Sequence, residues 1–221
     1  LSKQKAFNVK TIAINSDKSE FGATLSNENV LYFSSARRKT YKKTGWNDES
    51  FLDIYQSIFN PADGSLSPAT EVSELNTKWH DGPASFSSDG NVIYFSRDSR
   101  DEKDFESAKN INSKFSQIYL YTAKRVNGKW DNITQLPFNS KDYSVSNPSI
   151  SKDGKTLYFN SNMPGGLGGN DIWKVSIGQG DVYGKPENLG PRVNTEGNEQ
   201  FPSITEDNVL YFSSSSKQGL G

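Results

Sequence analysis

Few residues of this chain could take part in acid–base, nucleophilic or metal chemistry. His80 is the one histidine of the sequence, and there is no cysteine. A two-histidine metal centre and a thiolate zinc site are therefore excluded within this sequence. No Gly-x-Ser-x-Gly segment exists to present a serine to His80. The carboxylate pair Asp48-Glu49 lies in a polar segment, where nothing would raise a pKa for general-acid catalysis. The sequence predicts no catalytic residue, no metal and no cofactor.

Residue types suited to binding a partner are more abundant. The stretch from Met163 to Asn170 is rich in glycine, but it matches neither a dinucleotide-binding fingerprint nor a Walker motif, so it predicts a compact loop. Arginines and aromatic residues, which contribute most to interface energetics, gather in residues 36–51 and just before Asp81. The residues expected to contact a partner are Arg37, Arg38, Tyr41, Trp46, Trp79, His80, Met163 and Leu167.

The elements that must position these residues come from one repeated unit. Residues 21–34, 83–96, 148–160 and 202–213 align with one another. Each copy carries a Tyr-Phe pair, which begins at Tyr32, Tyr94, Tyr158 and Tyr211. Self-similarity at a fixed period is typical of repeat folds. We expect the Tyr-Phe pairs to pack between neighbouring repeats rather than to form an aromatic ligand cage.

Each repeat predicts four strands. Turn sequences such as Asp89-Gly90 and Asp153-Gly154 join a short first strand to a second strand that is apolar on both faces. Third strands are expected at residues 53–55, 117–119 and 171–173, and weaker fourth strands near 69–75, 133–136 and 186–189. An Asn-Ser or Asn-Thr pair then ends each unit. Four strands per repeat, with aromatics at fixed places, indicate an all-β protein, a β-propeller built of four-stranded antiparallel blades.

The predicted boundaries describe a single propeller domain with about three and a half blades. Residues 10–15 resemble an outer strand, and further blades are expected after Gly221 because a propeller must close to hide its sheet edges. The assigned segments are an outer strand and lead-in at 1–20, blade 1 at 21–77, blade 2 at 78–140, blade 3 at 141–195 and the start of blade 4 at 196–221.

Strand order also predicts which connections share a face. In an up-and-down blade, the loop between strands 2 and 3 and the link to the next blade leave the sheet at the same end. The 2–3 loops are long here and the 1–2 turns are minimal, so the 2–3 end is the candidate binding surface. The positions expected to face the propeller axis are small and neutral, which argues against an enzyme: Ala23, Ala84, Ser149 and Ser203.

Composition narrows the classes of partner. The 221 residues carry a formal net charge of −1, so nothing points to nucleic acid or to an anionic membrane. Mean hydropathy is low at −0.74, yet aromatic content is 12%, which favours a folded chain with polar loops over a disordered one. No apolar run approaches the roughly 18 residues of a membrane span.

Several phrases carry a resemblance to a known family. They are Phe51 to Tyr55, Leu136 to Ser144, Leu157 to Ile172 and Asn188 to Glu199, with the Met-Pro-Gly-Gly stretch from Met163 the most specific. Together they make essentially the whole chain similar to the TolB-like, WD-repeat-like propeller of PorE-type, OmpA-family proteins of the Bacteroidota type IX secretion and gliding machinery.

That resemblance implies a periplasmic protein held against the inner face of the outer membrane. It implies a non-catalytic scaffold whose partners are an outer-membrane β-barrel of PorP/SprF type and other secretion or gliding components. Peptidoglycan would be reached only through a separate OmpA-like domain outside this segment. Two alternatives remain open at this point: a glycan- or peptidoglycan-binding propeller, with Tyr41, Trp46 and Trp79 as stacking platforms, or a hydrolase of propeller fold.

Overall fold

A computed structural model describes residues 10–39, 48–103, 106–108 and 113–217 of the chain. Within those ranges it contains three antiparallel sheets of four strands and two of two strands. Blade 1 consists of β1 (Glu20–Leu25), β2 (Val30–Ser35), β3 (Asp53–Ile58) and β4 (Thr70–Glu71). Blade 2 consists of β5 (Asp81–Phe86), β6 (Val92–Asp98), β9 (Ile118–Val126) and β10 (Lys129–Gln135). Blade 3 consists of β11 (Val145–Ile150), β12 (Thr156–Ser161), β13 (Asp171–Ser176) and β14 (Glu187–Asn188).

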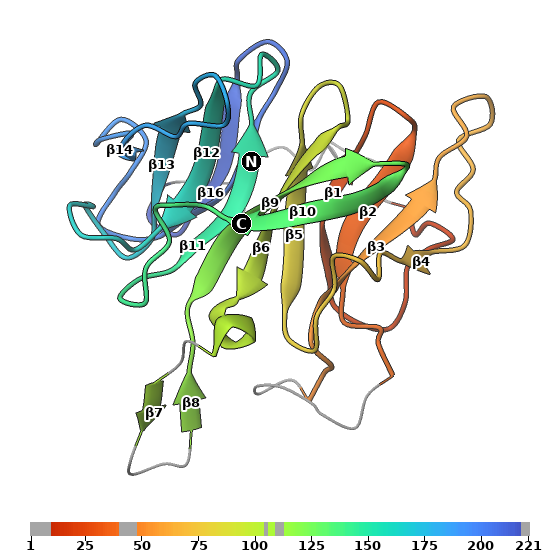
Figure 1. Cartoon of the computed structure of the whole chain (residues 1–221), viewed down its shortest axis with the longest axis horizontal. Coiled ribbons are helices and arrows are strands. Elements are labelled where there is room, and N and C mark those ends of the chain that lie inside the picture. Colours follow the sequence, from red (N-terminus) through yellow and green to blue (C-terminus); the bar gives the residue numbers. More distant parts are fainter. Residues whose placement is uncertain (1–9, 40–47, 104–105, 109–112, 218–221) are drawn as a thin grey trace, which may run out of the picture.

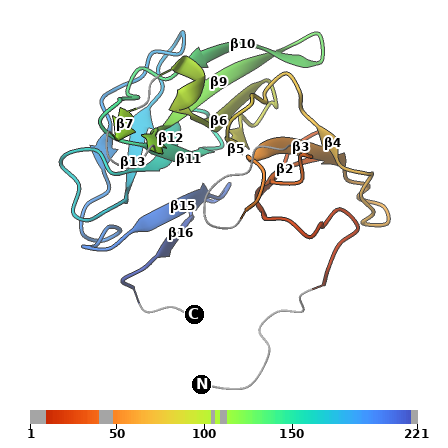
Figure 2. The same ribbon diagram turned by 90° about the horizontal axis from the view of Figure 1, so that it is seen from below.

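Blade 4 is represented by β15 (Glu199–Ile204) and β16 (Leu210–Ser214). The four blades stand side by side around a common axis, with the first strand of each blade innermost (Figures 1 and 2). The 2–3 loop of blade 2 contains a 3₁₀ turn, η1 (Ser99–Glu102), and a small hairpin of β7 (Glu106–Ala108) and β8 (Ser113–Phe115) that extends beyond the sheets (Figure 1). The expected all-β propeller of four-stranded blades is confirmed.

The hairpin between the first and second strands forms in the same way in every blade. The turn residues Asn29, Gly90, Gly154 and Asn208 all have φ between 58° and 71°. Glycine and asparagine adopt this left-handed conformation most readily. In blade 2 the Ser87 hydroxyl donates to the Asp89 carboxylate at 2.6 Å, which closes the turn from the side-chain end. These acidic residues therefore serve the turns, as the sequence predicted.

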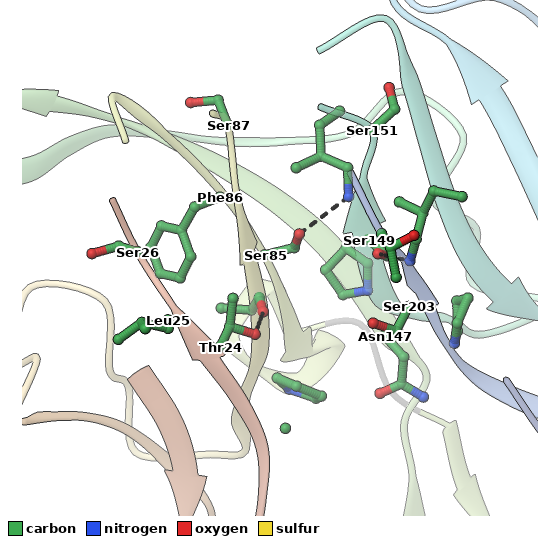
Figure 3. A pocket seen from close by; sticks show the side chains of 18 of the residues that line it. Thr24, Leu25, Ser26, Ser85, Phe86, Ser87, Asn147, Ser149, Ser151 and Ser203 are labelled. Carbon is green, nitrogen blue, oxygen red and sulfur yellow. Dashed lines mark hydrogen bonds between the residues drawn. The ribbon is translucent and has the colours of Figure 1, made fainter. Parts of the chain in front are cut away.

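The innermost strands hold neighbouring blades together through hydroxyl groups. Thr24 Oγ1 donates to the Ala84 carbonyl at 3.1 Å (Figure 3). At the equivalent position of the next two blades, the hydroxyl accepts a backbone amide instead: Ser85 from Ile150 at 3.1 Å and Ser149 from Ile204 at 3.0 Å. Each of these bonds satisfies a backbone group at the free edge of an inner strand.

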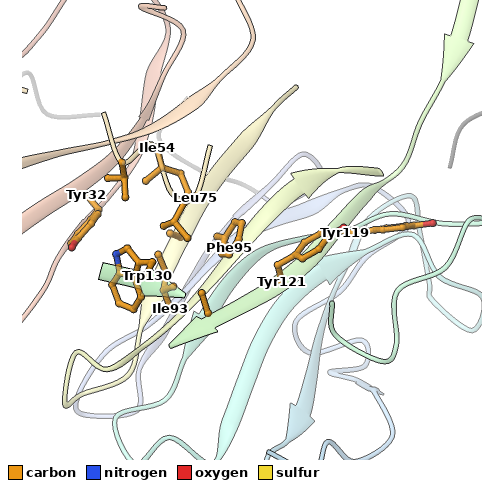
Figure 4. Packing of buried hydrophobic residues seen from close by; sticks show 11 residues of the cluster. Tyr32, Ile54, Leu75, Ile93, Phe95, Tyr119, Tyr121 and Trp130 are labelled. Carbon is orange, nitrogen blue, oxygen red and sulfur yellow. The ribbon is translucent and has the colours of Figure 1, made fainter. Parts of the chain in front are cut away.

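Apolar cores lie between the blades rather than within them. One cluster joins blades 1 and 2 and includes Tyr32, Ile54, Leu75, Phe95 and Trp130 (Figure 4). A second cluster joins blades 2 and 3. The Tyr-Phe pairs alternate across their strand, so the tyrosine packs against the next blade and the phenylalanine against the previous one. The predicted packing role of these pairs is confirmed for blades 1 and 2.

Two details differ from the prediction. Residues 10–15 form no strand; they form the same turn that follows the fourth strand in blades 1 and 3, and Ile14 is buried there. The two isoleucines at alternating positions, Ile12 and Ile14, imitate a strand pattern. Also, the end opposite the 2–3 loops is not made of minimal turns alone, because the 3–4 connections at 59–69 and 177–186 leave the sheets there.

Candidate functional site

The end of the blades that carries the 2–3 loops and the interblade links is called the loop face below. On this face, each link lies beside the start of the preceding blade's third strand. The Asp81 amide donates to the Leu52 carbonyl at 2.8 Å, and the Glu199 amide donates to the Asn170 carbonyl at 2.7 Å. The loop of one blade and the link to the next are therefore a single hydrogen-bonded unit.

An asparagine in each complete blade secures this unit from the other side. Asn76, Asn139 and Asn194, the link asparagines, each bond with both the amide and the carbonyl of one residue in the preceding third strand. Those residues are Ile54, Leu120 and Ile172, and the distances lie between 2.7 and 3.0 Å. The side-chain amide thus replaces a missing strand neighbour, which explains why an Asn-Ser or Asn-Thr pair ends each repeat.

Arg37, a predicted partner-binding residue, is part of the blade 1 framework. Its guanidinium forms an ion pair with Glu20, which opens β1, and donates to the Ile14 carbonyl at 2.7 Å. The same group lies 5.0 Å from the Phe33 ring centroid and 5.1 Å from that of Tyr55. We call this arrangement of an acid, a cation and two rings the clamp.

The carboxylate of the blade 1 clamp is strongly stabilised in its charged form. Burial alone would raise the pKa of Glu20. Hydrogen bonds from the Ser16 hydroxyl and amide, from Asn15 and from Arg37 outweigh burial and lower that pKa to about 2. Glu20 is therefore an anion at all physiological pH values and cannot serve as a proton donor there.

Blade 2 repeats the clamp with different spacing. Arg97 Nε bonds with the Asp81 carboxylate at 2.7 Å, and its NH2 group donates to the Leu75 carbonyl at 2.6 Å. The guanidinium stacks over Phe95 and Tyr121, at 5.1 and 4.8 Å from their centroids. Leu75 precedes Asn76 as Ile14 precedes Asn15, so the two arginines reach equivalent carbonyls.

Blades 3 and 4 vary the clamp. In blade 4, Lys217 lies 5.5 Å from the Phe212 ring centroid and donates to the Arg192 carbonyl at 2.9 Å, and it acts on Glu199 through its charge. In blade 3 the ion pair is replaced by apolar side chains: Val145 takes the place of the acid, and Met163 is buried in the same apolar cluster. Met163 is therefore a core residue, which corrects its prediction as a surface contact.

Arg38 forms a second ion pair in blade 1. It pairs with Asp53 at the start of β3 and donates to the Thr77 carbonyl at 2.7 Å. Burial raises the pKa of Asp53 to about 7, and the nearby Arg38 only partly opposes that rise. Asp53 Oδ2 is buried and has no hydrogen-bond partner among the residues that the structure describes. Arg38 thus joins the β2–β3 loop to the blade 1–blade 2 link.

Trp79 and His80 lie together in that link. The Phe51 ring meets Trp79 edge to face with centroids 5.3 Å apart, and His80 at 4.8 Å. Arg100, from η1, lies 4.6 Å from the Trp79 centroid. His80 Nδ1 accepts the Leu52 amide at 3.0 Å, and burial lowers the pKa of the ring, so the imidazole is neutral with its proton on Nε2.

Leu167 is the predicted contact that the structure leaves most accessible. Its side chain is 47% exposed, at the tip of the glycine-rich β12–β13 loop. The loop is held down because the Leu167 amide donates to Asp171 at 2.5 Å and the Gly169 amide to Gly197 at 2.8 Å. A Cβ on Gly168 would lie 2.4 Å from the Gly197 carbonyl, so this close approach requires glycine.

The sequence-predicted residues thus divide into distinct groups. Tyr41 and Trp46 lie outside the described residues. Trp79 and His80 meet in one cluster, and Arg37 and Arg38 belong to two ion pairs of blade 1. Sequence reasoning missed Phe51, Arg97 and Arg100 as residues of this face. Arg97 was detectable, because it stands where the other repeats have Ser35, Ser161 and Ser214.

Among the residues that the structure describes, no group of three or more histidine or carboxylate side chains is arranged to hold a metal ion. Likewise, no helix within those ranges has the length and apolar character needed to cross a membrane.

Comparison with known proteins gives a likeness of fold. No protein-family model and no curated protein matches the sequence. A puromycin-hydrolyzing peptidase of Mycobacterium tuberculosis superposes with a TM-score of 0.51 at 13% identity, over 91% of this chain and 29% of the peptidase. A putative TolB of Agrobacterium tumefaciens superposes with a TM-score of 0.46 at 15% identity, over 93% of this chain and 73% of that protein. At such identity the peptidase match concerns the fold alone, and this chain spans under a third of its length.

Proposed function

We propose that this chain is a non-catalytic protein-binding scaffold of the periplasm, whose loop face docks a protein of the outer membrane. The observation that carries the proposal is the construction of that face. Its long loops and links emerge from one end of the propeller, and each is fixed at its base by a clamp, an ion pair or a link asparagine. Loops fixed at the base lose less entropy when they bind a partner.

The charged residues of the loop face support a binding role over a catalytic one. Glu20, Asp81 and Glu199 bond with neighbouring side chains and amides at the starts of their strands. His80 is neutral and accepts a backbone amide. These groups are committed to holding the loops, so the face offers shape and exposed side chains to a partner rather than acids and bases to a substrate.

The partners in this proposal come from the resemblance to PorE-type, OmpA-family proteins. They are an outer-membrane β-barrel of PorP/SprF type and other secretion or gliding components. Attachment to peptidoglycan would come from an OmpA-like domain outside this segment. The role is then to link a secretion or gliding-adhesin complex to the cell wall.

The experiment compares single variants of the full-length protein in its native envelope. Arg37 and Arg38 are unsuitable targets because their loss would break the ion pairs with Glu20 and Asp53. Leu167→Glu changes the loop face, and Trp46→Ala removes a residue that the sequence predicts as a contact. Val182→Glu is the matched control because Val182 is 66% exposed in the β13–β14 connection at the opposite end. Affinity purification from solubilised outer membranes, followed by identification of co-purifying proteins, is the readout.

The proposal expects Leu167→Glu and Trp46→Ala to lose the outer-membrane barrel while Val182→Glu keeps it. All three variants should melt at wild-type temperature. If only Val182→Glu loses the barrel, the opposite end is the docking surface. If no outer-membrane protein co-purifies even with the unaltered protein, the scaffold proposal fails.

A further inference from the structure

The inner strands of the four blades line a cavity that the docking proposal does not use. Its volume is about 570 Å³, within the usual range for small-ligand sites. The lining comes from equivalent segments of the four repeats, at residues 21–27, 83–88, 147–152 and 201–206. Figure 3 shows Thr24, Ser85, Ser149 and Ser203 at this site, on the first strands of successive blades.

Phe201 is an unusual residue on this lining. It has φ of 53°, a conformation that is costly for a bulky side chain, at a position where blades 1 and 3 have Gly22 and Asn147. Its ring is 45% exposed, so burial does not compensate for the strain. The ring meets Phe21, from blade 1, edge to face with centroids 6.2 Å apart. A strained, exposed phenylalanine that meets a second exposed ring at a cavity indicates a binding role.

The hydroxyl groups of the lining still have hydrogen-bonding capacity. Ser85 and Ser149 accept backbone amides from the neighbouring blade, which leaves each O–H free to donate. Ser203 occupies the same position in blade 4 and bonds with no other described residue through its hydroxyl. Three equivalent hydroxyls therefore line one cavity with the exposed Phe21–Phe201 ring pair.

The charge of the lining restricts the ligand. Lys152 and Glu206 are its two ionisable side chains, and they pair with each other at 2.6 Å. A strongly anionic or cationic ligand would find no unpaired counter-charge on the lining and would lose its hydration on entry. The lining thus fits a neutral ligand that offers both hydroxyl groups and an apolar ring face.

We propose that the cavity binds a neutral saccharide chain. A sugar ring can lay its C–H face on Phe201 or Phe21, and its hydroxyls can bond with Ser85, Ser149 and Ser203. An extended peptide is the other neutral candidate, but it would need free backbone groups at the strand edge. The Ile150 and Ile204 amides and the Ala84 carbonyl already bond with lining hydroxyls.

The test is binding to the unaltered chain by isothermal titration calorimetry and by ligand-observed NMR. The probes are chitotetraose, maltotetraose and cellotetraose, with a neutral Gly-Ser-Asn repeat peptide as the competing class. Phe201→Gly removes the ring and also relieves the strained φ. Ser203→Ala removes one unpaired hydroxyl. Tyr211→Ala is the control, because Tyr211 is exposed on blade 4 but does not line the cavity.

We expect at least one tetrasaccharide to bind, Phe201→Gly to weaken it at least tenfold, and Ser203→Ala to weaken it several-fold. Phe201→Gly should melt at or above the wild-type temperature, a result that a purely structural phenylalanine would not give. Tyr211→Ala should bind normally. Binding of the peptide but no sugar, binding of neither, or unchanged sugar binding by Phe201→Gly would each overturn the proposal.

Discussion

Met163 in blade 3 occupies the position that Arg37 occupies in blade 1. Each lies two residues after the serine that ends its second strand, Ser161 and Ser35. Arg37 pairs with Glu20 and lies over the Phe33 ring, whereas Met163 and Val145 both belong to the apolar cluster between blades 2 and 3. The same location in the blade thus accepts either an ion pair or two apolar side chains.

This equivalence predicts how the stability of blade 1 changes when its ion pair is replaced by the apolar residues of blade 3. Glu20→Val alone leaves the Arg37 guanidinium largely buried without its carboxylate. We expect a loss of about 2–3 kcal/mol in the free energy of unfolding, at or below the range for fully buried pairs. The double variant Glu20→Val with Arg37→Met recreates the blade 3 pair and should lie within about 1 kcal/mol of the wild type.

Urea unfolding of the wild type, both single variants and the double variant gives the coupling energy. A double variant as unstable as the sum of the singles would mean that the two side chains do not act as a pair. Arg37→Met alone should cost less than Glu20→Val alone, because Glu20 keeps its bonds with Ser16 and Asn15.

Asp53 predicts a fall in stability as the pH rises. Burial raises its folded-state pKa to about 7, from 3.8 in the unfolded chain. Between these values the folded protein binds more protons than the unfolded one, so the free energy of unfolding falls with rising pH, by at most about 1.4 kcal/mol per pH unit. The contribution is complete below the unfolded pKa and is lost as the pH passes about 7.

Asp53→Asn is the comparison that isolates this effect. Its free energy of unfolding, measured by urea at about pH 5 and about pH 8, should change less with pH than that of the wild type. His80 contributes with the opposite sign, because burial lowers its pKa and favours folding as the pH rises. That contribution is present in both proteins and cancels in the difference. Parallel pH profiles for the two proteins would contradict the prediction.

Tyr94 and Ile58 predict unequal costs for truncation to alanine. Tyr94 is 4% exposed between blades 2 and 3, whereas Ile58, at the end of β3, is 64% exposed. Tyr94→Ala should lower the free energy of unfolding by about 3–5 kcal/mol, as for other large buried aromatics. Ile58→Ala should change it by less than about 1 kcal/mol. Coinciding thermal melts of the two variants would contradict the assignment of Tyr94 to the packed face between the blades.

The propeller was predictable because its signals are local and repeated. A Tyr-Phe pair and a turn residue with positive φ recur in each copy, and each signal depends only on its neighbours in sequence. The terminal strand assigned to residues 10–15 failed for the same reason. Two isoleucines at alternating positions imitate a strand, while the true environment of Ile14 depends on Phe33 and Tyr55 from later in the chain.

The roles of the loop-face residues were less predictable because their partners are distant in sequence. In the sequence, Arg37 and Arg38 resemble solvated charges that could contact a partner. In the structure they form ion pairs with Glu20 and Asp53 of blade 1. The sequence alone could not tell which of two adjacent arginines reaches which carboxylate. Leu167 is exposed, since an apolar residue between glycine pairs has little nearby to cover it, while its contact with a partner stays a prediction.

The link asparagines predict how much stability is lost when their bonds to the third strand are removed. The Asn194 side chain donates to the Ile172 carbonyl at 3.0 Å and accepts the Ile172 amide at 2.8 Å, and both residues are buried. Asn194→Ala leaves one buried donor and one buried acceptor without partners. Each costs about 1–3 kcal/mol, so we expect a loss of roughly 2–4 kcal/mol in the free energy of unfolding.

The matched control is Asn27→Ala, because Asn27 is exposed in the β1–β2 turn and should tolerate the change within about 0.5 kcal/mol. Hydrogen exchange adds a local readout, since the Ile172 amide should lose protection in Asn194→Ala while the Val175 amide, which lies further along the same strand, is less affected. Asn76→Ala and Asn139→Ala should repeat the result at Ile54 and Leu120. If all three variants unfold like the wild type, the asparagines serve only as turn residues. The loops and links of the loop face would then be held by the clamps alone.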